Sequence, residues 1–229
     1  MGRALHDYAM LQDGDRVAVG LSGGKDSWGL LWLLSDVKKR APIDFQLLPI
    51  YIDPGFDGGP GKTIERQCDA MGFELHVDVT DHGRVAHSEA NRENPCFLCS
   101  RLRRKRLFQI AEGYGCRKLA LAHHKEDLIE TLFLNMCFAG EISTMVPRQP
   151  FFEGRFEVIR PLAYAGEDDL DRLSQQMQWP VSRNPCPSAG KTKRAEIKQL
   201  LQQLYDSNSK VKSNIFRSMR HVKPEYLLK

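Results

Sequence analysis

Apolar residues occur along this chain in two patterns, short continuous runs and longer stretches with helical spacing. Continuous runs bounded by glycine or polar residues are typical of buried β-strands. They predict five strands, at residues 16–21, 45–52, 74–79, 118–122 and 156–159. Elsewhere the apolar residues recur every three or four positions, the spacing of a helix with one buried side. This spacing predicts one helix that begins at Asp26 and others at residues 63–71, 99–111, 126–138, 167–177 and 193–205.

Strands that alternate with helices are typical of βαβ units, so the sequence predicts an α/β fold with a mostly parallel sheet and helices on both faces. In such sheets, ligands bind at the carboxyl ends of the strands. Polar residues follow three of the predicted strands, and they are Ser22-Gly23-Gly24, Asp53 and His123-His124. We expect these residues to converge on one site.

The composition, with 41% hydrophobic and 27% charged residues among 229, suits one globular domain with a small appendage. The most loop-like stretch is 184–193. It predicts an α/β domain at residues 1–183, followed by a cysteine loop and a basic helical tail at residues 184–229. The chain has no run of 18 apolar residues, and its first residues lack the apolar core of a signal peptide. We therefore expect a cytoplasmic protein with no membrane partner.

The net charge of +4 is distributed unevenly. Residues 190–229 hold ten lysines and arginines against three acidic residues, a net charge of +7, which leaves −3 for the first 189 residues. A second basic cluster comprises Arg101, Arg103, Arg104, Lys105 and Arg106. Localised positive charge indicates a polyanion partner, although a solvated helix face and a lysine-rich tail give the same pattern.

A glycine-containing loop, Ser22-Gly23-Gly24-Lys25-Asp26-Ser27, joins the first predicted strand to the first predicted helix. Paired glycines let the backbone approach a ligand closely, and the helix start presents free N–H groups and a positive dipole end to phosphate. The two serines can add hydroxyl donors, and Lys25 can neutralise phosphate charge. Asp26 can hold Mg²⁺ or cap the helix. The loop is not a Walker A motif, because Asp26 follows the lysine and Val19 stands where the first glycine belongs.

The six cysteines of a cytoplasmic chain are more typical of metal ligands, catalytic groups or buried thiols than of disulfides. Cys96 and Cys99 form a Cys-x-x-Cys pair at a predicted helix start, and Cys186 lies between two prolines in a loop. Three cysteine ligands leave one position open, as in a [4Fe–4S] cluster with one iron free for substrate or sulfide. A structural zinc site and a redox-active Cys-x-x-Cys pair are the alternatives.

Four blocks of the sequence resemble the tRNA 2-thiocytidine synthetase family (TtcA), which lies within the PP-loop ATP pyrophosphatase superfamily. The blocks are residues 5–17 (LHDYAMLQDGDRV), 22–27 (SGGKDS), 95–104 (PCFLCSRLRR) and 123–135 (HHKEDLIETLFLN). The second block resembles the PP-loop, whose enzymes cleave ATP between the α and β phosphates. The chain departs from the family at Glu126-Asp127, where the family usually has two aspartates.

The resemblance implies a fold like that of the adenine nucleotide alpha hydrolases, with ATP bound over the first two strands. The residues then expected to contact ATP are Ser22, Gly23, Gly24, Lys25, Asp26, Ser27 and Asp53. Asp53 could equally serve only to open the turn that follows it. Mg²⁺ is expected on Asp26 and Asp127. The expected catalytic residues are Lys25, Asp26, Asp127 and His124, since at most one of the two adjacent histidines should face the site.

The resemblance also implies a reaction on tRNA. The C2 oxygen of an anticodon-loop cytidine is expected to be adenylylated, and sulfide on a [4Fe–4S] cluster is expected to replace it as AMP leaves. The expected cluster ligands are Cys96, Cys99 and Cys186, and the expected tRNA contacts are Arg101, Arg103 and Arg104. A sulfur donor, either a cysteine desulfurase or sulfide, and a homodimer are expected as partners.

Three other functions are left open by the sequence. A PP-loop ligase or amidotransferase that adenylylates a small molecule would need no cluster, and its three cysteines would be replaceable. A tRNA-binding or redox-sensing protein without catalysis is disfavoured by the intact loop at residues 22–27. A thiolase or desulfidase acting on another base would share the same chemistry up to the choice of base.

Overall fold

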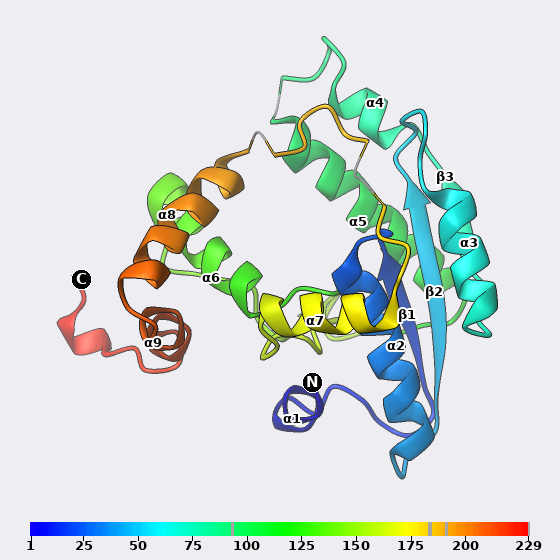
Figure 1. The fold of residues 1–229 in the computed structure, drawn as a ribbon, viewed down its shortest axis with the longest axis horizontal. Coiled ribbons are helices and arrows are strands. Elements are labelled where there is room, and N and C mark those ends of the chain that lie inside the picture. The colour runs from blue at the N-terminus through cyan, green and yellow to red at the C-terminus, as the bar shows by residue number, and fades with distance from the viewer. Residues whose placement is uncertain (93, 183–184, 191, 229) are drawn as a thin grey trace. The chain divides into compact units, whose positions relative to one another are not determined.

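The computed structural model of the chain describes residues 1–92, 94–182, 185–190 and 192–228. Within these residues, one six-stranded sheet has the order β3-β2-β1-β4-β6-β5 (Figure 1). The strands are β1 (Asp15–Leu21), β2 (Phe45–Asp53), β3 (His76–Val79), β4 (Lys118–Ala120), β5 (Arg148–Phe151) and β6 (Phe156–Ile159). Neighbouring strands pair in parallel, except that β5 pairs antiparallel with β6. The predicted α/β fold with a mostly parallel sheet is confirmed.

The register of the central strands brings their carboxyl ends to one edge of the sheet. Leu21, the last residue of β1, pairs with Tyr51 of β2, and Val19 of β1 pairs with Ala120, the last residue of β4. The segments that leave these three strands therefore start near one another, so residues far apart in the sequence can share a site.

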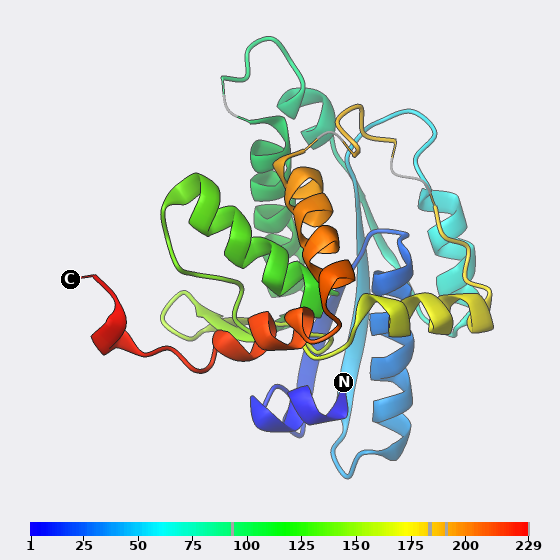
Figure 2. The ribbon, with the colours of Figure 1, turned by 60° about the vertical axis from the view of Figure 1, so that its left-hand side comes forward.

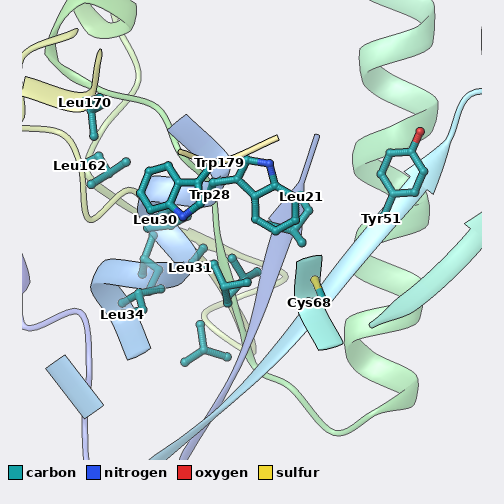
Figure 3. Close-up of a cluster of buried hydrophobic side chains, with 14 of the residues drawn as sticks. Leu21, Trp28, Leu30, Leu31, Leu34, Tyr51, Cys68, Leu162, Leu170 and Trp179 are labelled. Atoms are coloured by element: carbon teal, nitrogen blue, oxygen red, sulfur yellow. The ribbon is translucent and has the colours of Figure 1, made fainter. Parts of the chain in front are cut away.

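Helices cover both faces of the sheet, as the sequence predicts, because side chains of each strand point alternately to opposite faces. The helices of the first face are α1 (Gly2–Asp7), α2 (Lys25–Arg40), α3 (Gly61–Ala70) and α7 (Glu167–Met177). They share an apolar cluster with Val17, Val19 and Leu21 of β1. Figure 3 shows part of this cluster, which includes Trp28 of α2 and Trp179.

The second face of the sheet is covered by the longest helix, α5 (Pro95–Gly113), against which the short α4 (His82–Ala86) packs. Leu107, Ile110 and Ala111 of α5 share a buried cluster with Ala18 of β1 and Ile50 of β2. Helix α5 is anchored at its start by Asn94, whose side chain accepts hydrogen bonds from the backbone N–H groups of the first turn.

The chain forms two compact units, and the sheet belongs to the first, Met1–His124 with Val146–Ala189. The second unit, Lys125–Met145 with Gly190–Lys229, contains α6 (Lys125–Leu134), a π-helical turn (Asn135–Ala139), α8 (Lys193–Ser207), α9 (Val211–Ser218) and a 3₁₀ turn (Pro224–Tyr226). Helices α6 and α8 run side by side in Figure 2, in green and orange. Ile129, Ile197 and Leu201 form the buried centre of this unit. The division predicted between residues 183 and 184 falls outside the described residues and stays a prediction.

The structure differs from the sequence prediction in several short elements. Strand β5 and helices α1, α4 and α9 were not predicted, and α5 begins at Pro95 instead of position 99. The helix predicted at residues 126–138 ends as an α-helix at Leu134 and continues as the π-helical turn. In the described part of the chain, no helix combines the length and apolarity needed to span a bilayer.

Asp78 of β3 ties α5 to the sheet, and we expect this tie to depend on pH. Arg106 donates two hydrogen bonds to its carboxylate, at 2.8 and 2.7 Å. These bonds hold the pKa of Asp78 below its ordinary value, against the opposing effect of burial. A lowered folded pKa gives stability that is present above the unfolded pKa of about 3.9 and is lost as the pH falls through the folded pKa.

We therefore expect Asp78→Asn to lower the free energy of unfolding by about 1 kcal/mol at pH 7 and by progressively less below pH ~4. Urea unfolding of both proteins across pH 3–8 measures this. Asp57→Asn is the control, because Asp57 pairs with Arg84 while its own side chain is fully exposed. A deficit that stayed constant down to the lowest pH would show that packing, and not charge, carries the effect.

Candidate functional site

The loop between β1 and α2 turns through a glycine in a left-handed backbone conformation. Gly23 has φ +77°, and a Cβ atom added there would lie 3.2 Å from Cδ1 of Ile64. Gly24 is the N-cap of α2, so the free N–H groups at the start of this helix follow directly. The sequence prediction of a strand–glycine–helix turn at residues 22–27 is confirmed.

The serine hydroxyls of this loop hold the turn closed. Ser27 Oγ donates to the Gly24 carbonyl at 2.8 Å and accepts the Ser22 N–H at 3.2 Å. Ser22 Oγ in turn accepts the Gly24 N–H at 3.3 Å. The hydroxyls are thus used within the loop, which keeps its backbone in one conformation.

Lys25 and Asp26, the two charged residues of the loop, lie next to the acidic helix α7. Lys25 Nζ is 3.5 Å from Asp26, 3.4 Å from Glu167 and 2.9 Å from Asp171. Burial alone would lower the pKa of Lys25, but the hydrogen bond to Asp171 and the three negative charges outweigh it and raise the pKa. The ammonium group therefore stays positive, as a phosphate contact requires.

A cavity of about 460 Å³ opens at the carboxyl edge of the sheet, within the first unit. Its volume falls in the range of small-molecule sites. The polar and aromatic side chains of its lining include Ser22, Tyr51, Cys96, Cys99, Arg103, Arg104, His123 and Cys186. The serine–glycine loop and the three cysteines singled out from the sequence therefore share one cavity.

The three thiols of this cavity come from two segments of the chain. Cys96 and Cys99 lie one helical turn apart at the start of α5, so both face the same side. Burial raises the pKa of Cys96 and of Cys99, and the neighbouring thiol of Cys186 raises both further, whereas Arg103 lowers that of Cys99. In the described residues, none of the six cysteines forms a disulfide, and no three His, Cys, Asp or Glu side chains are close enough to hold one metal ion.

This arrangement suits a cluster better than a single ion. A structural zinc ion needs four ligands converging on one point. A four-iron cluster is itself several atoms wide, so its cysteines are spread around it. The three thiols around the cavity therefore fit an iron–sulfur cluster.

His87 is a cavity residue that sequence reasoning missed. Its Nδ1 lies 2.8 Å from the Gly83 carbonyl oxygen, which can only accept, so Nδ1 is the donor of this hydrogen bond. Nε2 lies 2.8 Å from Ser188 Oγ and 3.7 Å from Cys186 Sγ. His87 thereby ties the loop that carries Cys186 to α4. The only sequence signal was an isolated histidine 99 positions before that cysteine.

Two of the predicted RNA-contacting arginines are exposed and the third is not. Arg101 and Arg104 are exposed on α5. Arg103 is half-buried, lines the cavity and donates to the Leu21 carbonyl at 3.4 Å. It therefore contacts the end of β1, close to Cys99, instead of the surface.

Of the two adjacent histidines, His123 is the one that faces the cavity. His123 lines the cavity, whereas His124, which the sequence favoured, is only 5% exposed. The reason is the alternation of an extended chain, since Leu121 and His123 line the cavity and Ala122 packs on the opposite cluster. Asp53 Oδ1 accepts the Gly55 N–H at 2.9 Å, so in this structure it does open the turn that follows it.

Asp127 belongs to the second unit, at the start of α6, where three acidic side chains meet two basic ones. Arg194 Nη1 lies 3.5 Å from Asp127 and 3.0 Å from Glu130. Lys212 Nζ lies 2.9 Å from Glu126, the residue that departs from the family pattern. The shared magnesium site predicted for Asp26 and Asp127 stays a prediction.

Comparison with known proteins gives consistent results. A model of the PP-loop domain family matches residues 2–204. Over 232 residues, all of this chain and 86% of the relative, the sequence is 40% identical to the tRNA-cytidine(32) 2-sulfurtransferase of Pelobacter propionicus. The protein of the same name from Geotalea uraniireducens is 39% identical over all of this chain and 92% of its own length.

Two solved structures share the fold. The U34-tRNA thiolase NcsA of Methanococcus maripaludis, solved with its [4Fe–4S] cluster, matches with a TM-score of 0.79 at 24% identity, over 99% of this chain and 78% of that protein. The NH₃-dependent NAD synthetase of Campylobacter jejuni matches with a TM-score of 0.53 at 13% identity, over 100% and 93%. At these identities the likenesses concern the fold alone.

We expect Gly23→Ala to weaken ATP binding at least about tenfold, equivalent to about 1.4 kcal/mol, because the added methyl group crowds Ile64 and strains the loop. Isothermal titration calorimetry measures this. Gly72→Ala is the matched control, since Gly72 has φ +76° with nothing within 4 Å of the added Cβ atom. Both variants carry the backbone strain, and equal losses of affinity in the two would contradict the role of the loop.

We expect His87→Ala to raise hydrogen exchange at the backbone amides of residues 186–190 by about fivefold in the metal-free protein, because one anchoring hydrogen bond is worth about 1 kcal/mol. His87→Gln, which keeps an acceptor for Ser188, should exchange more slowly than His87→Ala. His76→Ala is the control, since His76 bonds Tyr114 away from the cavity. Unchanged protection in His87→Ala would show that the loop is held without this side chain.

Proposed function

Because this chain belongs to the PP-loop family and, within it, to the tRNA 2-thiocytidine synthetases, we propose that it uses ATP to replace the C2 oxygen of a tRNA cytidine with sulfur. Both relatives described above are named for cytidine 32, and we propose the same nucleotide here. The observation that carries the proposal is that the glycine-containing loop and three cysteine thiols line one cavity. Activation by ATP at the C2 oxygen and delivery of sulfur to the C2 carbon then take place on the same base, held in that cavity.

The activation step uses the loop at residues 22–27. Backbone N–H groups at the start of α2 and the ammonium of Lys25 bind the phosphates of ATP, while the closed turn fixes their position. The phosphates compete with Glu167 and Asp171 for Lys25. The C2 oxygen bonds to the α-phosphorus and pyrophosphate leaves. AMP later carries that oxygen away, when sulfur bonds to C2.

Asp26 is the carboxylate of the first unit proposed for Mg²⁺, which usually keeps several waters and needs only one or two protein ligands. His123, in the cavity lining, replaces His124 as the histidine proposed to contact the base. Asp53 is proposed to shape the loop after β2.

Cys96, Cys99 and Cys186 are proposed to hold a [4Fe–4S] cluster, which when bound supplies the site that carries sulfide to C2. Their raised pKa values mean that Cys96 and Cys99 release protons on binding iron. Arg103 opposes this by favouring the thiolate of Cys99. His87 and Ser188 hold Cys186 at the cavity.

The remaining partners follow from this reaction. Arg101 and Arg104, exposed beside the cavity, are proposed to contact tRNA phosphates. A cysteine desulfurase or inorganic sulfide is proposed as the sulfur donor, and a homodimer as the assembly. A cytoplasmic location is proposed, since cysteine thiols stay reduced in that compartment.

The proposal is tested by purifying the protein without oxygen and measuring iron, acid-labile sulfide and tRNA thiolation. We expect about four irons per chain and ATP-dependent 2-thiocytidine in digested tRNA. Cys186→Ala should lose iron and thiolation. Cys137→Ala is the matched control, since Cys137 is a free, exposed thiol of the second unit, and it should keep both.

The outcomes separate the proposal from its alternatives. A protein that binds no iron after anaerobic reconstitution, yet still releases pyrophosphate, would be a cluster-free adenylylating ligase. Iron without 2-thiocytidine, but with sulfur in or lost from another base, would be a thiolase or desulfidase of different specificity. Equal iron loss in Cys186→Ala and Cys137→Ala would contradict the proposed ligands.

A further inference from the structure

A second cavity, of about 980 Å³, lies at the opposite edge of the sheet from the first, still within the first unit. It is lined by residues at the amino ends of β1, β4 and β6. Its interior holds two close ion pairs, Lys118 with Asp15 at 2.6 Å and Arg148 with Glu157 at 2.6 Å. Within each pair the two charges neutralise each other, so the charge that this cavity presents to a partner comes from its rim.

The rim of the second cavity is positively charged. Lys105, Arg117 and Arg155 are exposed there, against one exposed acid, Glu112. Lys105 and Arg117 have no carboxylate within 4 Å in the part of the chain that the structure describes, and Arg155 bonds only the Phe152 carbonyl of its own turn. Cations without carboxylate partners around a hollow attract an anionic ligand.

The turn between β5 and β6 presents an aromatic ring to the same cavity. Phe152 is 55% exposed, and its ring meets Phe108 of α5 edge to face at 5.8 Å. Phe152 and Glu153 have φ +52° and +60°, a conformation that normally falls to glycine or asparagine. The strained backbone at Phe152 lowers the stability of the fold, and the exposed ring buries little apolar surface in return. The ring does offer a stacking surface of the kind that binds nucleotides, and Arg155 lies in the same turn.

Helix α5 connects the two cavities. Its exposed residues recur on one side, at Arg101, Arg104, Lys105, Gln109 and Glu112. Arg104 lines the first cavity and Lys105 the second. From Arg101 to Glu112 the helix rises about 16 Å, at 1.5 Å per residue. A ligand that uses both ends of this track must be an extended polyanion, because a small anion would occupy only one end.

We infer that this track, defined as Arg101, Arg104, Lys105, Arg117, Phe152 and Arg155, binds the backbone of the substrate RNA at a distance from the nucleotide that enters the first cavity. The inference rests on the proposed function and adds to it a second contact region for tRNA. Its cations neutralise phosphates without reading sequence, so it contributes affinity and register, not base choice.

The test compares Arg117→Glu/Arg155→Glu with the matched control Lys39→Glu/Arg66→Glu. The control cations are exposed on α2 and α3, which cover the other face of the sheet, and neither lines the first or the second cavity. Fluorescence anisotropy measures binding of a tRNA transcript and of a short anticodon-loop hairpin over a range of KCl concentrations. Iron content, melting temperature and thiolation of the hairpin are measured on the same samples.

We expect Arg117→Glu/Arg155→Glu to bind tRNA at least about tenfold more weakly, with the slope of log affinity against log salt reduced by about 2. Its hairpin thiolation and iron content should match those of the wild-type protein. Phe152→Gly should also weaken tRNA binding without lowering the melting temperature, because glycine has no Cβ atom and adopts a positive φ without strain. If the charge reversal lowers the melting temperature, Arg117→Gln/Arg155→Gln provides the same comparison.

Two failures are distinguishable. If the wild-type protein neither binds tRNA nor thiolates the hairpin, the proposed function fails, and this inference fails with it. If the wild-type protein thiolates tRNA but Arg117→Glu/Arg155→Glu binds it as well as the control variant does, only the RNA track is overturned, and its cations serve another anionic partner.

Discussion

The Ser27 hydroxyl lies inside the turn between β1 and α2, where it donates to the Gly24 carbonyl and accepts the Ser22 N–H. Because these bonds close the turn from within, its outward N–H groups are left for a ligand. The same turn also positions the cysteine loop, since the Gly23 carbonyl accepts the Ser182 N–H at 3.0 Å, four residues before Cys186. One local constraint thus fixes both the conformation of the proposed phosphate loop and the position at which the segment leading to Cys186 starts.

Helix α5 positions the other two thiols, Cys96 and Cys99, at the same cavity. One side of this helix faces the cavity and the other faces solvent. The residues at positions 96, 99, 103 and 107 recur at helical spacing and line the cavity. Arg103 belongs to this inner row, which explains why it bonds the Leu21 carbonyl instead of facing solvent. Arg101 belongs to the outer row, whereas Arg104 is exposed and also lines the cavity. Helical periodicity, applied to the arginines as well as to the apolar residues, would have separated Arg103 from Arg101 in the sequence alone.

The sequence predicted the elements whose apolar pattern is continuous, and missed those that depend on tertiary contacts. The buried strands were predicted from their continuous apolar runs, and α2, α3, α7 and α8 from apolar residues that recur at helical spacing. Strand β5 contains Pro150 and lies at the sheet edge, so it lacks a strand pattern. The loop and thiol sites were predicted from short motifs. His87 could not be, because its contact with Cys186 spans 99 positions and arises only when α4 packs on α5.

Glu126, which stands where the family usually has aspartate, forms its ion pair with a residue of the same compact unit. Glu126 is buried, and its carboxylate reaches Lys212 of α9 at 2.9 Å, while the Lys212 ammonium also lies 5.1 Å from the centre of the Tyr205 ring. Burial, with the charges of Glu126 and Glu130, raises the pKa of Tyr205 to about 12, so this phenol stays neutral. An aspartate is one methylene shorter and would leave Lys212 further from its partner. A buried pair tolerates such a loss poorly, because the remaining charge is uncompensated. The glutamate therefore accompanies the docking of the basic tail on α6, and the adjacent Asp127 is the carboxylate that keeps the family's residue type.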